Sequence, residues 1–88
     1  MRTPSQVAVE IAGRLSVDLP DVRNPRVTTI GVIRARRLIA YVLRVEQNRS
    51  WGDVSRAIGV TRRACRRLCR YTSEKPESDL ASYLGRDA

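Results

Sequence analysis

The sequence predicts a small all-α domain that contains a helix-turn-helix. Two observations predict this fold: apolar residues recur every three or four positions over most of the chain, and Ser or Thr residues able to cap a helix precede several of these segments. The chain has 88 residues, of which 42% are apolar and 30% charged, as is typical of a globular domain. We expect residues 1–71 to form the helix-turn-helix domain and residues 72–88 to form a linker and a short C-terminal helical tail.

The first predicted helix covers residues 4–15. Thr3 can cap it, and Gln6 stands where a capping box places Glu or Gln. Pro4 suits the first helical position. The helix buries one apolar stripe, formed by Val7, Ile11 and Leu15. Residues 16–22 allow one helical turn, and residues 23–31 predict a basic loop.

The longest predicted helix covers residues 32–47, which hold neither Gly nor Pro. Its apolar residues form a stripe wide enough to be buried on more than one side: Ile33, Leu38, Ile39, Tyr41, Val42, Leu43 and Val45. Its first turns carry Arg34, Arg36 and Arg37, and positive charge there opposes the helix dipole. Because this placement destabilises the helix, we expect the arginines to serve another function. The spacing leaves open whether Arg36 faces the core.

A helix-turn-helix is predicted from helix 50–58, a turn at Gly59-Val60 and helix 61–71. Ser50 and Thr61 are suited to cap the two helices, and Ser55 is small enough for a close helix crossing. Trp51 is interpreted as a core or rim aromatic residue, ahead of a DNA-backbone contact through its indole N–H. The apolar residues that pack the second helix on the first are Ala64, Cys65, Leu68 and Cys69.

The net charge of +8 is concentrated in the middle of the chain. Residues 23–70 carry thirteen Arg against Glu46 and Asp53, for a net charge of +11. Charges of one sign at this density repel one another and favour unfolding unless a polyanion neutralises them. Nucleic acid is the expected polyanion, ahead of an anionic membrane surface or an acidic protein.

The arginines of helix 61–71 sharpen this expectation, because its outer face is entirely cationic. Arg62, Arg63 and Arg66 lie nearest its N-terminus, where groove-facing helices contact base edges, and are the candidate base contacts. Phosphate contacts are expected from Arg67 and Arg70, and from Ser50 and Thr61 through hydroxyls or helix-terminal amides.

Most enzyme classes are excluded by composition. The chain has no His, so a His-based catalytic site is impossible, and two Cys cannot complete a four-ligand zinc site without it. Cys65 and Cys69 are expected to be reduced and to serve as small apolar core residues. We therefore expect no enzyme activity, no metal and no cofactor.

From about Val7 to Tyr71, the order of parts resembles the C-terminal DNA-binding domain of the bacterial replication initiator DnaA. In that family a first helix leads through an acidic turn into a basic loop, and a long helix with an Arg-Ala-Arg-Gln type run precedes a helix-turn-helix. The acidic turn is similar to residues 17–22 (Val-Asp-Leu-Pro-Asp-Val), and the basic run to residues 34–37 (Arg-Ala-Arg-Arg). The first motif helix is similar to residues 50–59 (Ser-Trp-Gly-Asp-Val-Ser-Arg-Ala-Ile-Gly).

The resemblance implies a DnaA-like, Trp-repressor-like helical fold and a surface for double-stranded DNA. It also implies backbone or minor-groove contacts in the basic loop and the long helix, at Arg23, Arg26, Arg34 and Arg37. The family's Asp-His-Thr-Thr signature is replaced here by residues 60–65 (Val-Thr-Arg-Arg-Ala-Cys), so the initiator's binding-box specificity is not implied. A lone Arg-rich chain of this kind resembles the stand-alone DnaA-like transcription regulators of phages and gene transfer agents.

The sequence thus predicts a cytoplasmic, nucleoid-associated transcription regulator that binds specific double-stranded DNA. The alternative is a replication-initiation or adaptor protein that docks an acidic partner through its Arg-rich face; RNA binding and enzyme activity rank below both. RNA polymerase or another DNA-binding protein is the candidate second partner. The apolar residues left over for a dimer are few, namely Leu80, Ala81, Tyr83 and Leu84. We therefore expect a monomer in free solution, with several copies assembling on DNA.

Overall fold

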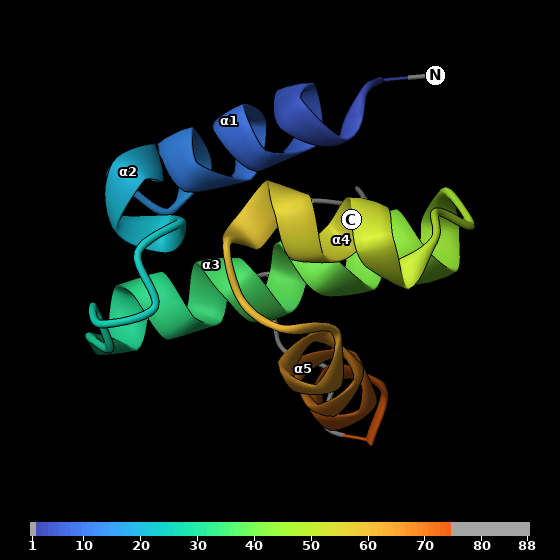
Figure 1. Cartoon of the computed structure of the whole chain (residues 1–88). Helices are drawn as coiled ribbons and strands as arrows, with labels where there is room; N and C mark the ends of the chain where they lie inside the picture. Colours follow the sequence, from blue (N-terminus) through green and yellow to red (C-terminus); the bar gives the residue numbers. More distant parts are fainter. Residues whose placement is uncertain (1, 75–88) are drawn as a thin grey trace.

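The computed structural model describes residues 2–74, and the regular elements of this range are helices (Figure 1). They are α1 (Pro4–Arg14), α2 (Leu19–Val22), α3 (Ile30–Tyr41), the π-helical turn η1 (Val42–Glu46), α4 (Trp51–Ile58) and α5 (Arg62–Glu74). The predicted all-α fold is confirmed. Of the predicted linker and tail over residues 72–88, residues 72–74 belong to α5, and the rest, with Leu80 and Leu84, lies outside the described residues.

Helix α3 and its continuation η1 form the centre of the domain. Figure 1 shows α1 lying above α3, α4 in front of it, and α5 crossing below it, viewed almost end-on. Each of α1, α2, α4 and α5 packs against α3. The largest fully buried side chains come from all of these layers and include Ile11, Val22, Ile39, Leu43, Ile58 and Cys65.

The predicted capping box at the start of α1 is confirmed. The Thr3 hydroxyl accepts a hydrogen bond from the Gln6 backbone N–H at 3.2 Å, and the Thr3 N–H donates to Gln6 Oε1 at 2.9 Å. Val7 and Ile11 are fully buried, and Leu15 is half-buried against the same core. The cap and the four-residue spacing of these apolar side chains therefore fix the position and the rotation of α1.

Helix α3 begins at Ile30, so the prediction that the loop runs through Gly31 is wrong. Thr29 is its N-cap residue, and Gly31 lies in the first turn. A Cβ atom at Gly31 would stand 3.1 Å from Val17 Cγ1, so the missing side chain lets Val17 pack closely against this turn. The next residue, Val32, is buried, whereas the predicted core residue Ile33 is only half-buried.

The long helix ends in a widened turn, and this turn removes Val45 from the predicted core stripe. The Gln47 N–H donates to the Val42 carbonyl five residues earlier at 3.0 Å, and the stretch Val42–Glu46 is π-helical. Such a turn holds about one residue more than an α-helical turn, so the following side chains rotate off the α-helical stripe. Val45 is consequently 49% exposed. Asn48 ends the helix as predicted, in the left-handed conformation with φ of 53°.

The helix-turn-helix forms where the sequence predicts it. The Ser50 hydroxyl accepts from the Asp53 N–H at 3.1 Å, and the Thr61 hydroxyl accepts from the Ala64 N–H at 3.1 Å. In the turn, the Ser55 hydroxyl donates to the Val60 carbonyl at 2.5 Å. The predicted inner face of α5 also faces inward, with Cys65 and Cys69 buried and Ala64 and Leu68 half-buried. Helix α5 continues to Glu74, three residues beyond its predicted end at 71.

Gly59 allows the turn of the helix-turn-helix to pack directly against the backbone of the basic loop. Its φ of 68° lies in the left-handed region, and a Cβ atom there would stand 2.1 Å from the Arg23 carbonyl oxygen. The Arg23 side chain also joins α4 and α1 at this point. Its Nε donates to the Ala57 carbonyl at 3.3 Å, and its Nη2 donates to Ser5 Oγ at 3.4 Å. The loop, α1 and the end of α4 therefore meet at Arg23.

The side chain of Arg36, whose orientation the sequence spacing left open, points into the core. It is 5% exposed, and its guanidinium donates to three backbone carbonyls: Val22 at 2.8 Å, Asp21 at 3.1 Å and Asn24 at 2.5 Å. Burial lowers the pKa of Arg36. The three carbonyls lie at and just beyond the C-terminal end of α2, where backbone oxygens have no partner within the helix. Arg36 thus fastens the start of the basic loop to α3.

We expect Gly59→Ala to destabilise the domain by more than about 2 kcal/mol, because it combines a strained φ with a clash against a backbone oxygen. Gly13→Ala is the matched control: Gly13 lies in α1, and a Cβ atom there has nothing within 4 Å. That change should stabilise the domain by about 0.5 kcal/mol. Urea unfolding followed by circular dichroism measures both. Equal effects of the two substitutions would contradict the packing of Gly59 on Arg23.

We expect Arg36→Met to destabilise the domain by about 2–3 kcal/mol, because three partly buried carbonyls lose their donor. Arg26→Met is the control, since Arg26 is an exposed arginine of the loop that Arg36 contacts and should change the free energy of unfolding by less than about 0.5 kcal/mol. Thermal unfolding of the two variants in parallel gives the comparison. An Arg36→Met variant with unchanged stability would mean that the three carbonyls accept hydrogen bonds from other donors.

Candidate nucleic-acid interface

The outer face of α5 is a surface of arginines. Its members are all exposed and are the five predicted from the sequence: Arg62, Arg63, Arg66, Arg67 and Arg70. The face turned inward carries Cys65 and Cys69, both buried in the core. Helix α5 is therefore divided into an apolar face that packs on α3 and α4 and a cationic face turned to solvent.

Four of these arginines surround one hollow. Arg63, Arg66, Arg67 and Arg70 line a concave space of about 370 Å³ on α5. Guanidinium groups are planar, and each offers several N–H donors in a fixed geometry that matches a phosphate or the major-groove edge of guanine. The hollow can therefore hold an anionic or acceptor-rich group through several charge-assisted hydrogen bonds.

The N-terminal ends of α4 and α5 add hydroxyl groups to this surface. Ser50 and Thr61 are exposed, and each hydroxyl oxygen accepts a backbone N–H in its cap. A hydroxyl that accepts in this way keeps its hydrogen for a further acceptor such as a phosphate oxygen. Arg62 extends from α5 toward α4, since its Nη2 would stand 3.3 Å from a Cβ atom on Gly52. The first turn of α4 is thus bordered by Arg62.

Trp51 is contacted by two arginines from different elements. Its indole is half-buried against the core, as predicted for a core or rim aromatic residue. The Arg44 guanidinium carbon lies 4.6 Å from the ring centroid, and that of Arg66 lies 5.8 Å from it. Both distances are within the range of cation–π attraction. The sequence pattern gave no signal for this contact, because the fold alone brings residues 44, 51 and 66 together.

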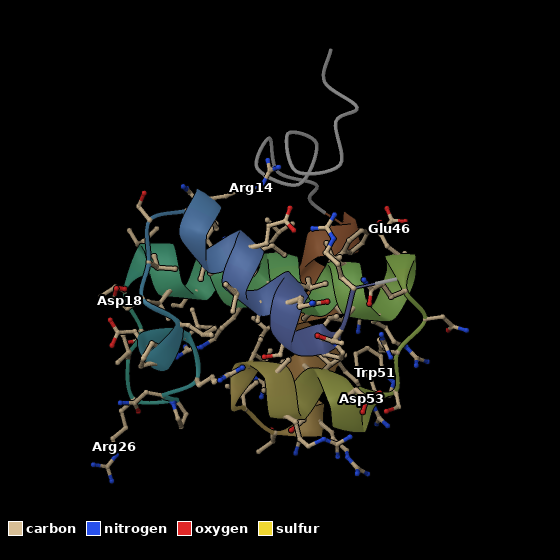
Figure 2. All side chains as sticks on the ribbon, turned by 90° about the horizontal axis from the view of Figure 1, so that it is seen from above. Arg14, Asp18, Arg26, Glu46, Trp51 and Asp53 are labelled. Atoms are coloured by element: carbon tan, nitrogen blue, oxygen red, sulfur yellow. The ribbon has the colours of Figure 1, made fainter. Side chains whose placement is uncertain are left out.

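The predicted loop and long-helix contacts separate into different environments. Arg26 is exposed and, in Figure 2, projects from the loop at one edge of the domain, whereas Trp51 lies at the opposite edge. Arg34 is exposed on α3, and Arg37 is half-buried. Arg23 is exposed, but its guanidinium donates to Ala57 and Ser5 within the domain. Arg26 in the loop and Arg34 on α3 thus both lie on the solvent-exposed surface.

A groove of about 650 Å³ runs between α3 and α5. Apolar atoms of Ile33, Val60, Ala64 and Leu68 line it, and Arg37, Arg67 and Arg70 add cationic groups. The groove brings Arg37 to the same region as two of the α5 arginines. Sequence reasoning did not predict it, because the half-buried position of Ile33 depends on how α5 crosses α3.

The two cysteines are buried free thiols. Burial raises the pKa of Cys65 from 9.0 to about 11, and burial also raises the pKa of Cys69, an effect opposed by the nearby charge of Arg44. Within residues 2–74, no cluster of His, Cys, Asp or Glu could hold a metal ion. The same range contains no helix of the length and apolarity that crossing a membrane requires.

Comparison with known proteins found no match: no family model fits the sequence, and no curated protein and no solved structure is significantly similar to the chain. The resemblance to the DNA-binding domain of DnaA therefore depends on the residues quoted for it and stays a prediction.

Because the fold raises the pKa of Cys65 to about 11, the protonated thiol stabilises the domain, and this contribution is complete below pH 9. We expect the free energy of unfolding to fall as the pH rises from 9 toward 11. Unfolding of the wild-type protein and of Cys65→Ala across this range tests the expectation. The variant should show a shallower dependence on pH, and identical slopes would contradict the assignment to Cys65.

Proposed function

We propose that this chain is a sequence-specific double-stranded DNA-binding protein that reads the major groove with α5. The observation that carries the proposal is the outer face of α5, which exposes five arginines on a helix held in place by a helix-turn-helix. A helix of this motif enters the major groove with its exposed face toward the bases. The cationic face of α5 has the charge and the hydrogen-bond donors for that placement.

Electrostatics supports a polyanionic partner. Among the described residues of α5, positions 62–70 carry five arginines and no acidic residue, so neighbouring turns of the helix repel one another. A duplex carries one negative charge per about 1.7 Å of its axis and releases counterions when arginines replace them. Binding DNA would therefore relieve a repulsion that is built into the free protein.

The positions of the arginines support distinct roles. Arg62, Arg63 and Arg66 occupy the N-terminal half of α5 and are proposed to contact base edges, and Arg67 and Arg70 to contact phosphates. Arg26 and Arg34 are exposed beside the loop and are proposed to contact the backbone or the minor groove. Arg37 borders the groove next to Arg67, which fits a phosphate contact shared between α3 and α5.

A role in transcription regulation, in a bacterium or a phage-derived element, rests on the resemblance to stand-alone DnaA-like regulators. The same resemblance underlies the proposed cytoplasmic, nucleoid-associated location. The domain itself supplies a DNA-reading surface, and a regulator needs in addition a second contact. RNA polymerase or another DNA-binding protein is the proposed source of that contact.

One observation favours the second candidate function, an adaptor that docks an acidic protein. The groove between α3 and α5 combines the apolar residues Ile33 and Leu68 with the cationic residues Arg37 and Arg70. An amphipathic helix with acidic residues beside its apolar stripe matches this combination of surfaces. An adaptor of this kind would show no preference between duplex sequences, so comparing its affinities for a selected and a random duplex separates the two functions.

We expect Arg62→Ala, Arg63→Ala and Arg66→Ala each to cost about 1–3 kcal/mol on the preferred duplex and much less on random duplex, because a bidentate base contact is lost. The preferred duplex is first selected in vitro from random DNA, and fluorescence anisotropy then gives both dissociation constants. An arginine whose loss weakens both duplexes equally is a phosphate contact.

Arg26→Ala and Arg34→Ala serve as the contrasting variants in the same assay. Each should weaken all duplexes alike and reduce the slope of log K against log salt by about one. The proposed function itself fails if the wild-type protein binds the selected and the random duplex with the same affinity.

A further inference from the structure

We infer that Trp51 is a positioning residue that holds Arg66 in place for reading DNA; the inference rests on the proposed function. Trp51 begins α4 and Arg66 lies in the middle of α5, so the contact joins the two helices of the motif. The Arg66 guanidinium carbon lies 5.8 Å from the centroid of the indole ring. An exposed arginine on a helix otherwise samples many rotamers.

The ring that Arg66 contacts is also held by a second arginine. Arg44, in the π-helical turn η1, places its guanidinium carbon 4.6 Å from the same centroid. Its Nη1 also donates to the Arg49 carbonyl at 3.0 Å, which holds the Arg44 side chain against the segment before α4. With its indole also packed against the core, Trp51 provides a rigid face for Arg66.

The contact affects what Arg66 can do on DNA. A guanidinium held near a ring by cation–π attraction still has N–H donors available for other acceptors. Arg66 also lines the hollow formed with Arg63, Arg67 and Arg70, so these donors remain next to the exposed surface of α5. Restricting the side chain before binding reduces the entropy lost when it pairs with a base. Trp51 thus acts on sequence preference through Arg66, without contacting DNA itself.

The test compares Trp51→Leu, which removes the ring, with Trp51→Phe, which retains an aromatic face. We expect Trp51→Leu to lower the ratio of affinities for selected and random duplex about two- to fivefold, and Trp51→Phe to restore part of that loss. A residue that only stabilises the fold would weaken binding to both duplexes without changing their ratio. Circular dichroism confirms that each variant is folded at the assay temperature.

A double-mutant cycle assigns the effect to Arg66. In the Arg66→Ala background, Trp51→Leu should no longer change the affinity ratio, whereas in the Arg63→Ala background it should lower the ratio by the same factor as in the wild type. Arg63 is the matched control, since it is an exposed arginine one turn earlier on α5. Equal effects of Trp51→Leu in both backgrounds would overturn the inference.

A measurement on the free protein keeps the inference testable if Trp51→Leu does not fold. The indole ring current should shift the side-chain protons of Arg66 upfield in the NMR spectrum of the wild-type protein, relative to those of Arg63. Unshifted Arg66 protons would overturn the contact. This readout needs no DNA. A wild-type chain without duplex preference would overturn the proposed function, and the NMR shift would still decide whether Arg66 contacts Trp51.

Discussion

The rest of the domain depends on the hydrogen bonds that the buried Arg36 guanidinium donates to three carbonyl oxygens. They join α3, the central helix, to residues 21–24, where α2 ends and the basic loop begins. The loop then positions the backbone of Arg23, against which Gly59 and the turn of the motif are packed. The orientation of α5 on the domain therefore follows from a chain of contacts that starts at a single side chain.

A buried cation is tolerable here because its partners are well placed. The carbonyls beyond the last turn of a helix carry partial negative charge and have no partner within that helix. Arg36 donates hydrogen bonds to carbonyl oxygens that would otherwise be buried without a partner. In return, these oxygens compensate the cost of burying the Arg36 charge. Its neighbour Arg34 faces solvent. One short basic run therefore provides both a structural bond and exposed charge.

Much of the fold could be predicted from the sequence because its signals are local. The Thr3 capping box, the Ser50 and Thr61 caps and the left-handed Gly59 depend on a few neighbouring residues, and the buried faces follow from helical spacing. The errors lie where the residue pattern carries no signal. Gly31 is in the first turn of α3 with Val17 packed close to it, and Val45 is exposed because the turn at its position is π-helical. For the candidate site, the exposure of the α5 arginines was predictable, but the contacts of Trp51 and the groove beside Ile33 were not, since distant segments create them.

The packing of Gly59 on the Arg23 backbone has a consequence for the length of a DNA site. It joins the loop that carries Arg26 to the start of α5 with no spacer that could stretch. For a duplex bound as proposed, the separation between a contact from the loop and a contact from α5 is then constant. One inserted base pair rotates the duplex by about 34–36°. On such a duplex, the phosphate contacted from the loop must therefore lie at a fixed helical phase relative to the bases contacted from α5.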